Sequence, residues 1–218
     1  MGFEILLYVP NIIGYIRILL IATSISFYWQ PPVFLTLYIL SVLLDGLDGY
    51  AARQLNQISA FGAWFDVVID ICGRGYLWCV LYDWGYLVAA LEWIVFVCTH
   101  TQGAEWKKSY IQAPWFVSMV MANNFKTPMG AYVITGLHFL PVWLYAYYTN
   151  FLTSGLGLPV WVQFSGICML SSARAVCMFV EMWCVLAHIR YLLSDEANRE
   201  FSIKNTTNGS LKSGGTTR

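Results

Sequence analysis

Four acidic residues fall within a 26-residue window of apolar sequence: Asp45, Asp48, Asp66 and Asp70. On helices, Asp45 and Asp48 (i, i+3) share one face, and so do Asp66 and Asp70 (i, i+4). Two antiparallel helices would therefore direct four carboxylates into one pocket. Such groups are stable in apolar surroundings only when they are paired or when cations lie among them. The pattern predicts a divalent-cation site, and hard oxygen ligands favour Mg²⁺ or Mn²⁺ over zinc.

The residues between the carboxylates suit a phosphate-bearing ligand, because protein-bound Mg²⁺ commonly shares its coordination with substrate phosphates. Arg53 offers a planar guanidinium that matches phosphate oxygens. Gly49, Ala52 and Gly62 leave the helix surfaces bare, so that a ligand can approach closely. Small residues at this spacing also suit helix packing. The carboxylates favour the ligand interpretation, since packing does not require them.

Composition restricts the class of protein. The 218 residues are 58% hydrophobic and only 11% charged, which excludes a water-soluble domain. Twelve Lys and Arg balance twelve Asp and Glu, so nothing in the net charge indicates a nucleic-acid partner. The six cysteines form no C-x-x-C pair and are expected to be buried apolar side chains.

Hydropathy and helix breakers predict an all-α polytopic membrane protein with six transmembrane helices. The expected spans cover residues 8–29, 33–45, 62–81, 86–101, 129–148 and 160 to about 190, and the second continues as a helix through residue 53. The polar stretch 102–128 has no assigned role. The tail 194–218 is expected to be disordered, which leaves residues 1–193 as the transmembrane catalytic domain.

Basic residues predict the orientation in the membrane, because loops that carry Lys or Arg remain in the cytosol. The connections 30–32, 82–85 and 149–159 contain no Lys or Arg. They are therefore expected on the side away from the cytosol. Both termini and the four carboxylates are then cytosolic.

The motif D-x-x-D-G-x-x-A-R-x₈-G-x-x-x-D-x-x-x-D, which runs from Asp45 to Asp70, resembles the signature of the CDP-alcohol phosphatidyltransferases at all eight fixed positions. The resemblance implies the six-helix membrane fold of that family, usually as a homodimer. It also implies an enzyme that transfers a phosphate-bearing group from a CDP-linked donor to an alcohol and releases CMP.

The same resemblance assigns roles to individual residues. The four aspartates would hold two divalent ions, Mg²⁺ or Mn²⁺, on the donor pyrophosphate, and Asp70 would also be the general base. Five residues match positions that bind the CDP-diacylglycerol donor: Gly49, Ala52, Arg53, Ser59 and Gly62.

The residues in and around the motif indicate which alcohol is the acceptor. The segments 8–17 and 52–57 resemble eukaryotic family members that use inositol more closely than members that use glycerophosphate, choline or serine. The resemblance thus implies CDP-diacylglycerol and myo-inositol as substrates, and the endoplasmic reticulum membrane as the location. Ile71 stands where the family usually has Lys or Arg, and Arg74, one turn after Asp70, can replace that charge. Three basic residues are candidates for the acceptor site: Arg17, Lys126 and Arg174.

Two alternatives remain at this stage. The same chemistry can serve another acceptor, such as glycerol 3-phosphate, serine or an amino alcohol. A non-catalytic relative that binds a nucleotide-lipid is the second, although a protein that only binds has no need of a base. Arg174 and Glu181, seven residues apart, form either a structural charge pair or a lining of the acceptor pocket. Glu92 is expected to be solvated near the far interface.

Overall fold

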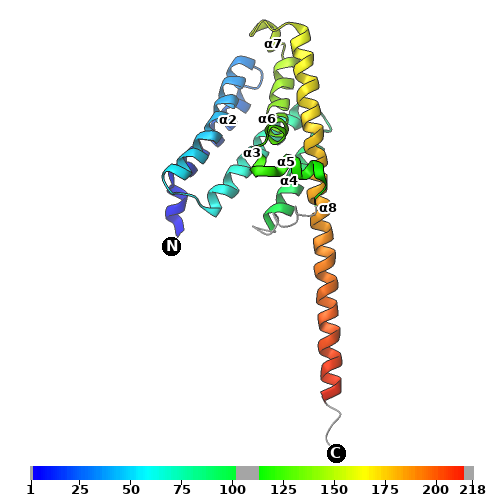
Figure 1. The fold of residues 1–218 in the computed structure, drawn as a ribbon. Coiled ribbons are helices and arrows are strands. Elements are labelled where there is room, and N and C mark those ends of the chain that lie inside the picture. The colour runs from blue at the N-terminus through cyan, green and yellow to red at the C-terminus, as the bar shows by residue number, and fades with distance from the viewer. Residues whose placement is uncertain (1, 102–112, 214–218) are drawn as a thin grey trace, which may run out of the picture.

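The computed structural model describes residues 2–101 and 113–213, and these ranges are helical without a strand. The long helices are α1 (Val9–Ser26), α2 (Pro31–Gln54), α3 (Ala60–Leu81), α4 (Gly85–Thr101), α6 (Pro128–Tyr148) and α8 (Val160–Ser213). The short ones are η1 (Gly2–Leu7), α5 (Trp115–Met121), η3 (Ala122–Phe125) and α7 (Phe151–Ser154). The all-α class is confirmed, and each expected span falls on one long helix (Figure 1).

Local sequence explains where these helices begin. Pro31 begins α2 at a position where a missing backbone N–H has no cost. Ser59 caps α3, since its Oγ accepts a hydrogen bond of 3.0 Å from the backbone nitrogen of Gly62. Thr127 caps α6 in the same way, through a 3.0 Å bond from the nitrogen of Gly130. The Ser59 cap therefore fixes where α3 begins, and α3 carries two of the four aspartates of the predicted cation site.

Among the described residues, four segments are long and apolar enough to cross a membrane: α1, α2, α6 and Val160–Glu196 of α8. The apolar stretch of α4, Gly85–His100, is shorter. Helix α3 has 22 residues but carries Asp66, Asp70 and Arg74 in its middle. The count of six spans stays a prediction, because α3 holds the charges of the site and α4 is short.

The polar stretch and the tail are described in part. Residues 102–112 and 214–218 lie outside the described residues, and α5 and η3 occupy most of 113–128. Helix α8 continues without interruption past residue 193 to Ser213 and extends far beyond the other helices (Figure 1). The division of the chain at residue 193 stays a prediction.

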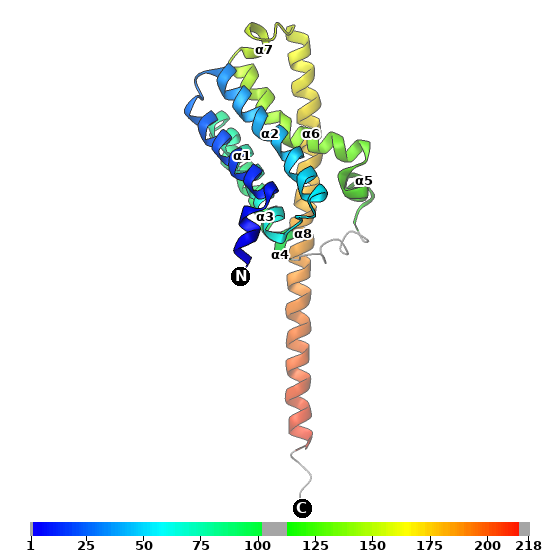
Figure 2. The ribbon, with the colours of Figure 1, turned by 90° about the vertical axis from the view of Figure 1, so that its left-hand side faces the viewer.

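Helix α3 connects two pairs of helices. Helix α1 packs along α2, and α6 packs along α8, while α3 contacts α1, α4 and α6 (Figure 2). An aromatic cluster joins α2 to α6, where the rings of Phe34 and Tyr145 are fully buried with centroids 4.2 Å apart. Side chains on one face of α3 thus meet α1 and α2, and those on another meet α4 and α6.

The crossing of α6 and α8 is close at Gly136. A methyl group at this position would lie 2.8 Å from the backbone nitrogen of Arg174 and 2.9 Å from the backbone oxygen of Leu170. We expect Gly136→Ala to lower the free energy of unfolding by about 1–3 kcal/mol, because backbone atoms cannot yield as a side chain can. Thermal unfolding in detergent measures the change.

Gly46→Ala is the matched control, since a methyl group there has no heavy atom within 4 Å. It lies within α2, where alanine favours the helix over glycine by about 1 kcal/mol. We expect this variant to be at least as stable as the unmodified chain. Equal stability of Gly136→Ala and the unmodified chain would contradict the close α6–α8 crossing.

Candidate functional site

The four aspartates of the motif surround a single guanidinium. Arg17, from the middle of α1, is 1% exposed. Its Nη1 lies 2.7 Å from Asp48 Oδ2 and 2.6 Å from Asp66 Oδ1. Its Nη2 lies 2.8 Å from Asp45 Oδ1 and 2.6 Å from Asp70 Oδ1. Three consecutive helices therefore meet at one cluster of charges, which we call the carboxylate cluster: Arg17, Asp45, Asp48, Asp66 and Asp70.

The carboxylate cluster has an excess of negative charge, since one guanidinium faces four carboxylates. Asp45 Oδ1 is buried and makes no hydrogen bond among the described residues, although it lies near Arg17. Ligand oxygens of Asp45, Asp48 and Asp66 lie within 4.8 Å of one another. A buried carboxylate oxygen without a hydrogen bond and three oxygens at this separation fit a hard divalent cation. The cluster can therefore hold a metal ion.

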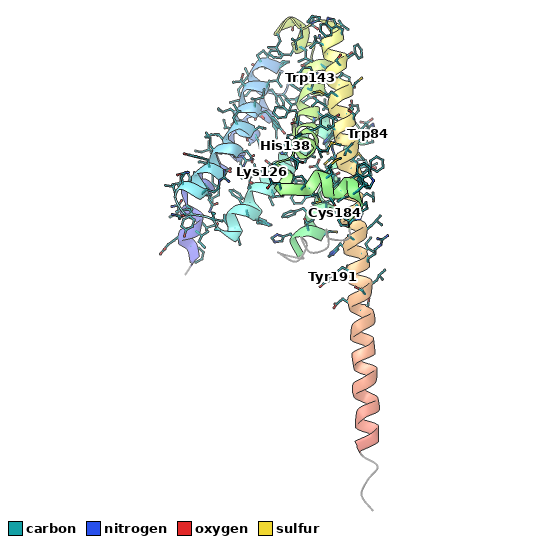
Figure 3. The ribbon with its side chains drawn as sticks, in the orientation of Figure 1. Trp84, Lys126, His138, Trp143, Cys184 and Tyr191 are labelled. Carbon is teal, nitrogen blue, oxygen red and sulfur yellow. The ribbon has the colours of Figure 1, made fainter. Side chains whose placement is uncertain are left out.

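Asp70 is held at both of its oxygens. Oδ1 contacts Arg17, while Oδ2 lies 3.3 Å from Arg74 Nη1 and 3.1 Å from Nε2 of His138. His138 lies on α6 (Figure 3), and its Nδ1 is 3.0 Å from the backbone oxygen of Ile134. These contacts fix the orientation of the Asp70 carboxylate between α1, α3 and α6.

The contact between His138 and Asp70 was not predicted from the sequence. The two residues lie 68 positions apart, and no spacing rule joins them. A signal was nevertheless present, because an ionisable residue in the middle of an apolar membrane helix usually faces the interior.

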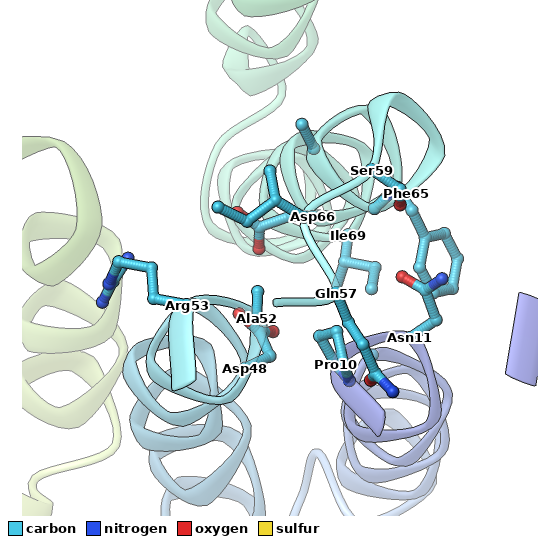
Figure 4. A pocket seen from close by; sticks show the side chains of 15 residues that line it. Pro10, Asn11, Asp48, Ala52, Arg53, Gln57, Ser59, Phe65, Asp66 and Ile69 are labelled. Carbon is cyan, nitrogen blue, oxygen red and sulfur yellow. The ribbon is translucent and has the colours of Figure 1, made fainter. Parts of the chain in front are cut away.

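A cavity of about 270 Å³ opens beside the carboxylate cluster, between α1, α2 and α3; we call it the motif cavity. Asp48 and Asp66 face the same space in Figure 4, with Pro10 and Asn11 of α1 on one side and Arg53 on the other. All five residues expected to bind the donor line this cavity: Gly49, Ala52, Arg53, Ser59 and Gly62. The fixed positions of the motif other than Asp45 and Asp70 thus line one space, which Pro10 and Asn11 also line.

A second group of charges is buried beyond Arg74. Arg74 Nε lies 3.0 Å from Glu92 Oε2 of α4, and Arg174 Nη2 lies 3.4 Å from Glu92 Oε1. Arg174 Nη1 lies 2.8 Å from Glu181 Oε2, so these two residues do form a charge pair. The expectation of a solvated Glu92 is wrong, because its side chain is buried between two guanidiniums.

The three candidates for the acceptor site lie apart from one another. Arg17 belongs to the carboxylate cluster, and Arg174 belongs to the buried charges between α4 and α8. Lys126 is exposed at the end of η3 (Figure 3). The structure does not bring them to one pocket, and Arg74 is the basic residue that contacts both Asp70 and Glu92.

Comparison with known proteins agrees with this geometry. The profile of the family described as CDP-alcohol phosphatidyltransferase matches residues 7–189, and the chain belongs to this family. Together with the four apolar helices, membership makes the chain an integral membrane protein.

Several curated relatives carry the name CDP-diacylglycerol--inositol 3-phosphatidyltransferase. The Homo sapiens protein is 52% identical over 72 residues, which are 32% of this chain and 33% of the relative. The Schizosaccharomyces pombe protein is 44% identical over 75 residues (34% and 32%), and the Saccharomyces cerevisiae protein 41% over 96 residues (43% and 40%). The matched stretch thus spans about a third of the length of the first two relatives. No solved structure matches the chain.

Proposed function

We propose that the chain transfers the phosphatidyl group of CDP-diacylglycerol to myo-inositol and releases phosphatidylinositol and CMP. The observation that carries this proposal is the carboxylate cluster, in which four aspartates from α2 and α3 meet beside a cavity lined by the rest of the family motif. The names of the curated relatives support inositol as the acceptor.

The reaction needs one base and one leaving group. A hydroxyl oxygen of inositol attacks the lipid-bearing phosphorus, and the bond from that phosphorus to the bridging oxygen breaks. CMP leaves with the bridging oxygen, and the hydroxyl proton passes to Asp70. Both Asp70 oxygens have contacts that hold the carboxylate in one orientation, as a base that must reach the attacking hydroxyl requires.

The motif residues have separate roles in binding the donor. Gly49, Ala52, Arg53, Ser59 and Gly62 would contact the CDP group in the motif cavity. The four aspartates would hold two divalent ions, Mg²⁺ or Mn²⁺, which supply charge neutralisation for the pyrophosphate. Arg17 keeps the carboxylates together from the side of α1.

The membrane arrangement follows from the same proposal. Six spans would place the carboxylate cluster at the cytosolic side, where inositol is soluble and the lipid donor is still in reach. The distribution of Lys and Arg among the connections supports this orientation. The family resemblance supports a homodimer, and the likeness to eukaryotic members supports the endoplasmic reticulum membrane. The catalytic domain would be residues 1–193.

An acceptor panel tests the proposed function. The purified chain is given CDP-diacylglycerol, Mn²⁺ and one acceptor at a time: myo-inositol, glycerol 3-phosphate, serine, ethanolamine or choline. We expect CMP release with myo-inositol alone. Release with another alcohol would assign the same chemistry to that acceptor, and binding of the donor without CMP release would indicate a non-catalytic protein.

A further inference from the structure

A second cavity, of about 640 Å³, lies on the other side of α3 from the motif cavity; we call it the α8 cavity. Its wall is mostly apolar and comes from α3, α4, α5, α6 and α8. Within the described part of the chain, three charged residues from three different helices line it: Arg74, Glu92 and Glu181. An apolar cavity with a few convergent polar groups is the usual form of a small-molecule site.

The charged side chains at this wall are one guanidinium and two carboxylates. Arg174, which does not line the cavity, lies between Glu92 and Glu181 and balances the second carboxylate. Arg74, Glu92, Arg174 and Glu181 form a continuous chain of ion pairs, and each residue is less than one-tenth exposed. Arg174 Nε is buried without a hydrogen-bond partner among the described residues. Buried donors of this kind call for an explanation, because most find a partner. Packing does not explain the four charges either, since apolar residues often replace a buried ion pair without loss of stability.

We propose that Arg74, Glu92 and Glu181 recognise the uncharged polyol acceptor in the α8 cavity. Carboxylates accept hydrogen bonds from hydroxyl groups and guanidiniums donate to them, so a lining with both kinds of group matches a ring with a hydroxyl on every carbon. Among the residues that the structure describes, an anionic acceptor such as glycerol 3-phosphate would meet two carboxylates and one guanidinium in this lining. This inference rests on the proposed transfer to inositol and names the residues that select it.

The position of Arg74 connects recognition with reaction. Its Nη1 lies 3.3 Å from Asp70 Oδ2, and its Nε lies 3.0 Å from Glu92 Oε2. A hydroxyl group bound to Arg74 would therefore lie next to a side chain that contacts the proposed base, Asp70. The donor would lie on one side of α3 and the acceptor on the other, with Asp70 between them.

The test compares the KM for myo-inositol with the KM for CDP-diacylglycerol in variants of the full chain. For Glu92→Gln and Glu181→Gln we expect the KM for myo-inositol to rise about ten-fold or more, as loss of one hydrogen bond to a charged group implies. The KM for CDP-diacylglycerol should stay within about two-fold. Glu196→Gln is the matched control, because Glu196 is exposed on the same helix, α8, and should leave both constants unchanged.

A paired replacement separates recognition from stability. Arg174→Met with Glu181→Leu removes both partners of one ion pair, so no buried charge is left alone there and the fold should survive. Recognition predicts that the KM for inositol stays raised in this variant. A purely structural role predicts a return to the unmodified value, and that result would overturn the inference.

Equilibrium binding of radiolabelled myo-inositol distinguishes a failure of the recognition site from a failure of the proposed transfer reaction. If the unmodified chain transfers to inositol and Glu92→Gln keeps its affinity, the inference fails and the proposed function stands. If the unmodified chain binds inositol without releasing CMP, the transfer fails, and loss of binding in Glu92→Gln still supports the recognition site. Absence of both binding and transfer would overturn both.

Discussion

Asp70→Asn is expected to lower kcat by about 10²–10⁴-fold, because an amide cannot take the proton of the acceptor hydroxyl. The substitution preserves the shape of the side chain and an oxygen for Arg17 or Arg74 to contact. The loss should therefore appear in kcat, while the KM for CDP-diacylglycerol changes little. Steady-state rates of CMP release, with each substrate varied in turn, measure the two constants separately.

Asp83→Asn is the control for this prediction. Asp83 is exposed in the turn between α3 and α4, 13 residues after Asp70, and its replacement should leave kcat unchanged. A kcat for Asp70→Asn that equals the unmodified value would remove Asp70 as the base. Equal losses in Asp70→Asn and Asp83→Asn would indicate damage to the fold instead.

Arg17→Met is expected to lower the free energy of unfolding by about 3–5 kcal/mol, since it leaves four carboxylates without their shared cation. A divalent cation that binds the folded state should restore part of this loss. Thermal unfolding in detergent, with and without Mn²⁺, measures both effects. We expect Mn²⁺ to raise the Tm of Arg17→Met by more than it raises the Tm of the unmodified chain.

Arg190→Met removes the same charge from an exposed position of α8 and should change stability by no more than about 0.5 kcal/mol. A destabilised Arg17→Met that gains nothing from Mn²⁺ would mean that Arg17 only packs against its neighbours. A stable Arg17→Met variant would contradict this account, because carboxylates this close together should repel one another once the guanidinium is removed.

The helices and one half of the site could be predicted from local sequence. Pro31 and Pro128 mark helix starts, and the i, i+3 and i, i+4 spacings place each pair of aspartates on one helix face. The motif residues are close in sequence and lie on two consecutive helices. Their convergence therefore depends on one short connection between α2 and α3.

The other half depends on contacts that local sequence does not specify. Glu92 meets Arg174 across 82 residues, and His138 meets Asp70 across 68. A membrane helix that is apolar on all sides gives no pattern to show which face points inward. The ionisable residues themselves were the available signal, because burial in the bilayer requires a partner for each. Which residue is the partner of Glu92 or of His138 is known only from how α4, α6 and α8 pack in the structure.

The most direct measurement is the product balance of the purified chain with CDP-diacylglycerol and myo-inositol. We expect phosphatidylinositol and CMP to appear in equal amounts, both to stop when a chelator removes divalent ions, and both to return when Mg²⁺ or Mn²⁺ is restored. CMP without phosphatidylinositol, or turnover that the chelator does not change, would contradict transfer at the carboxylate cluster.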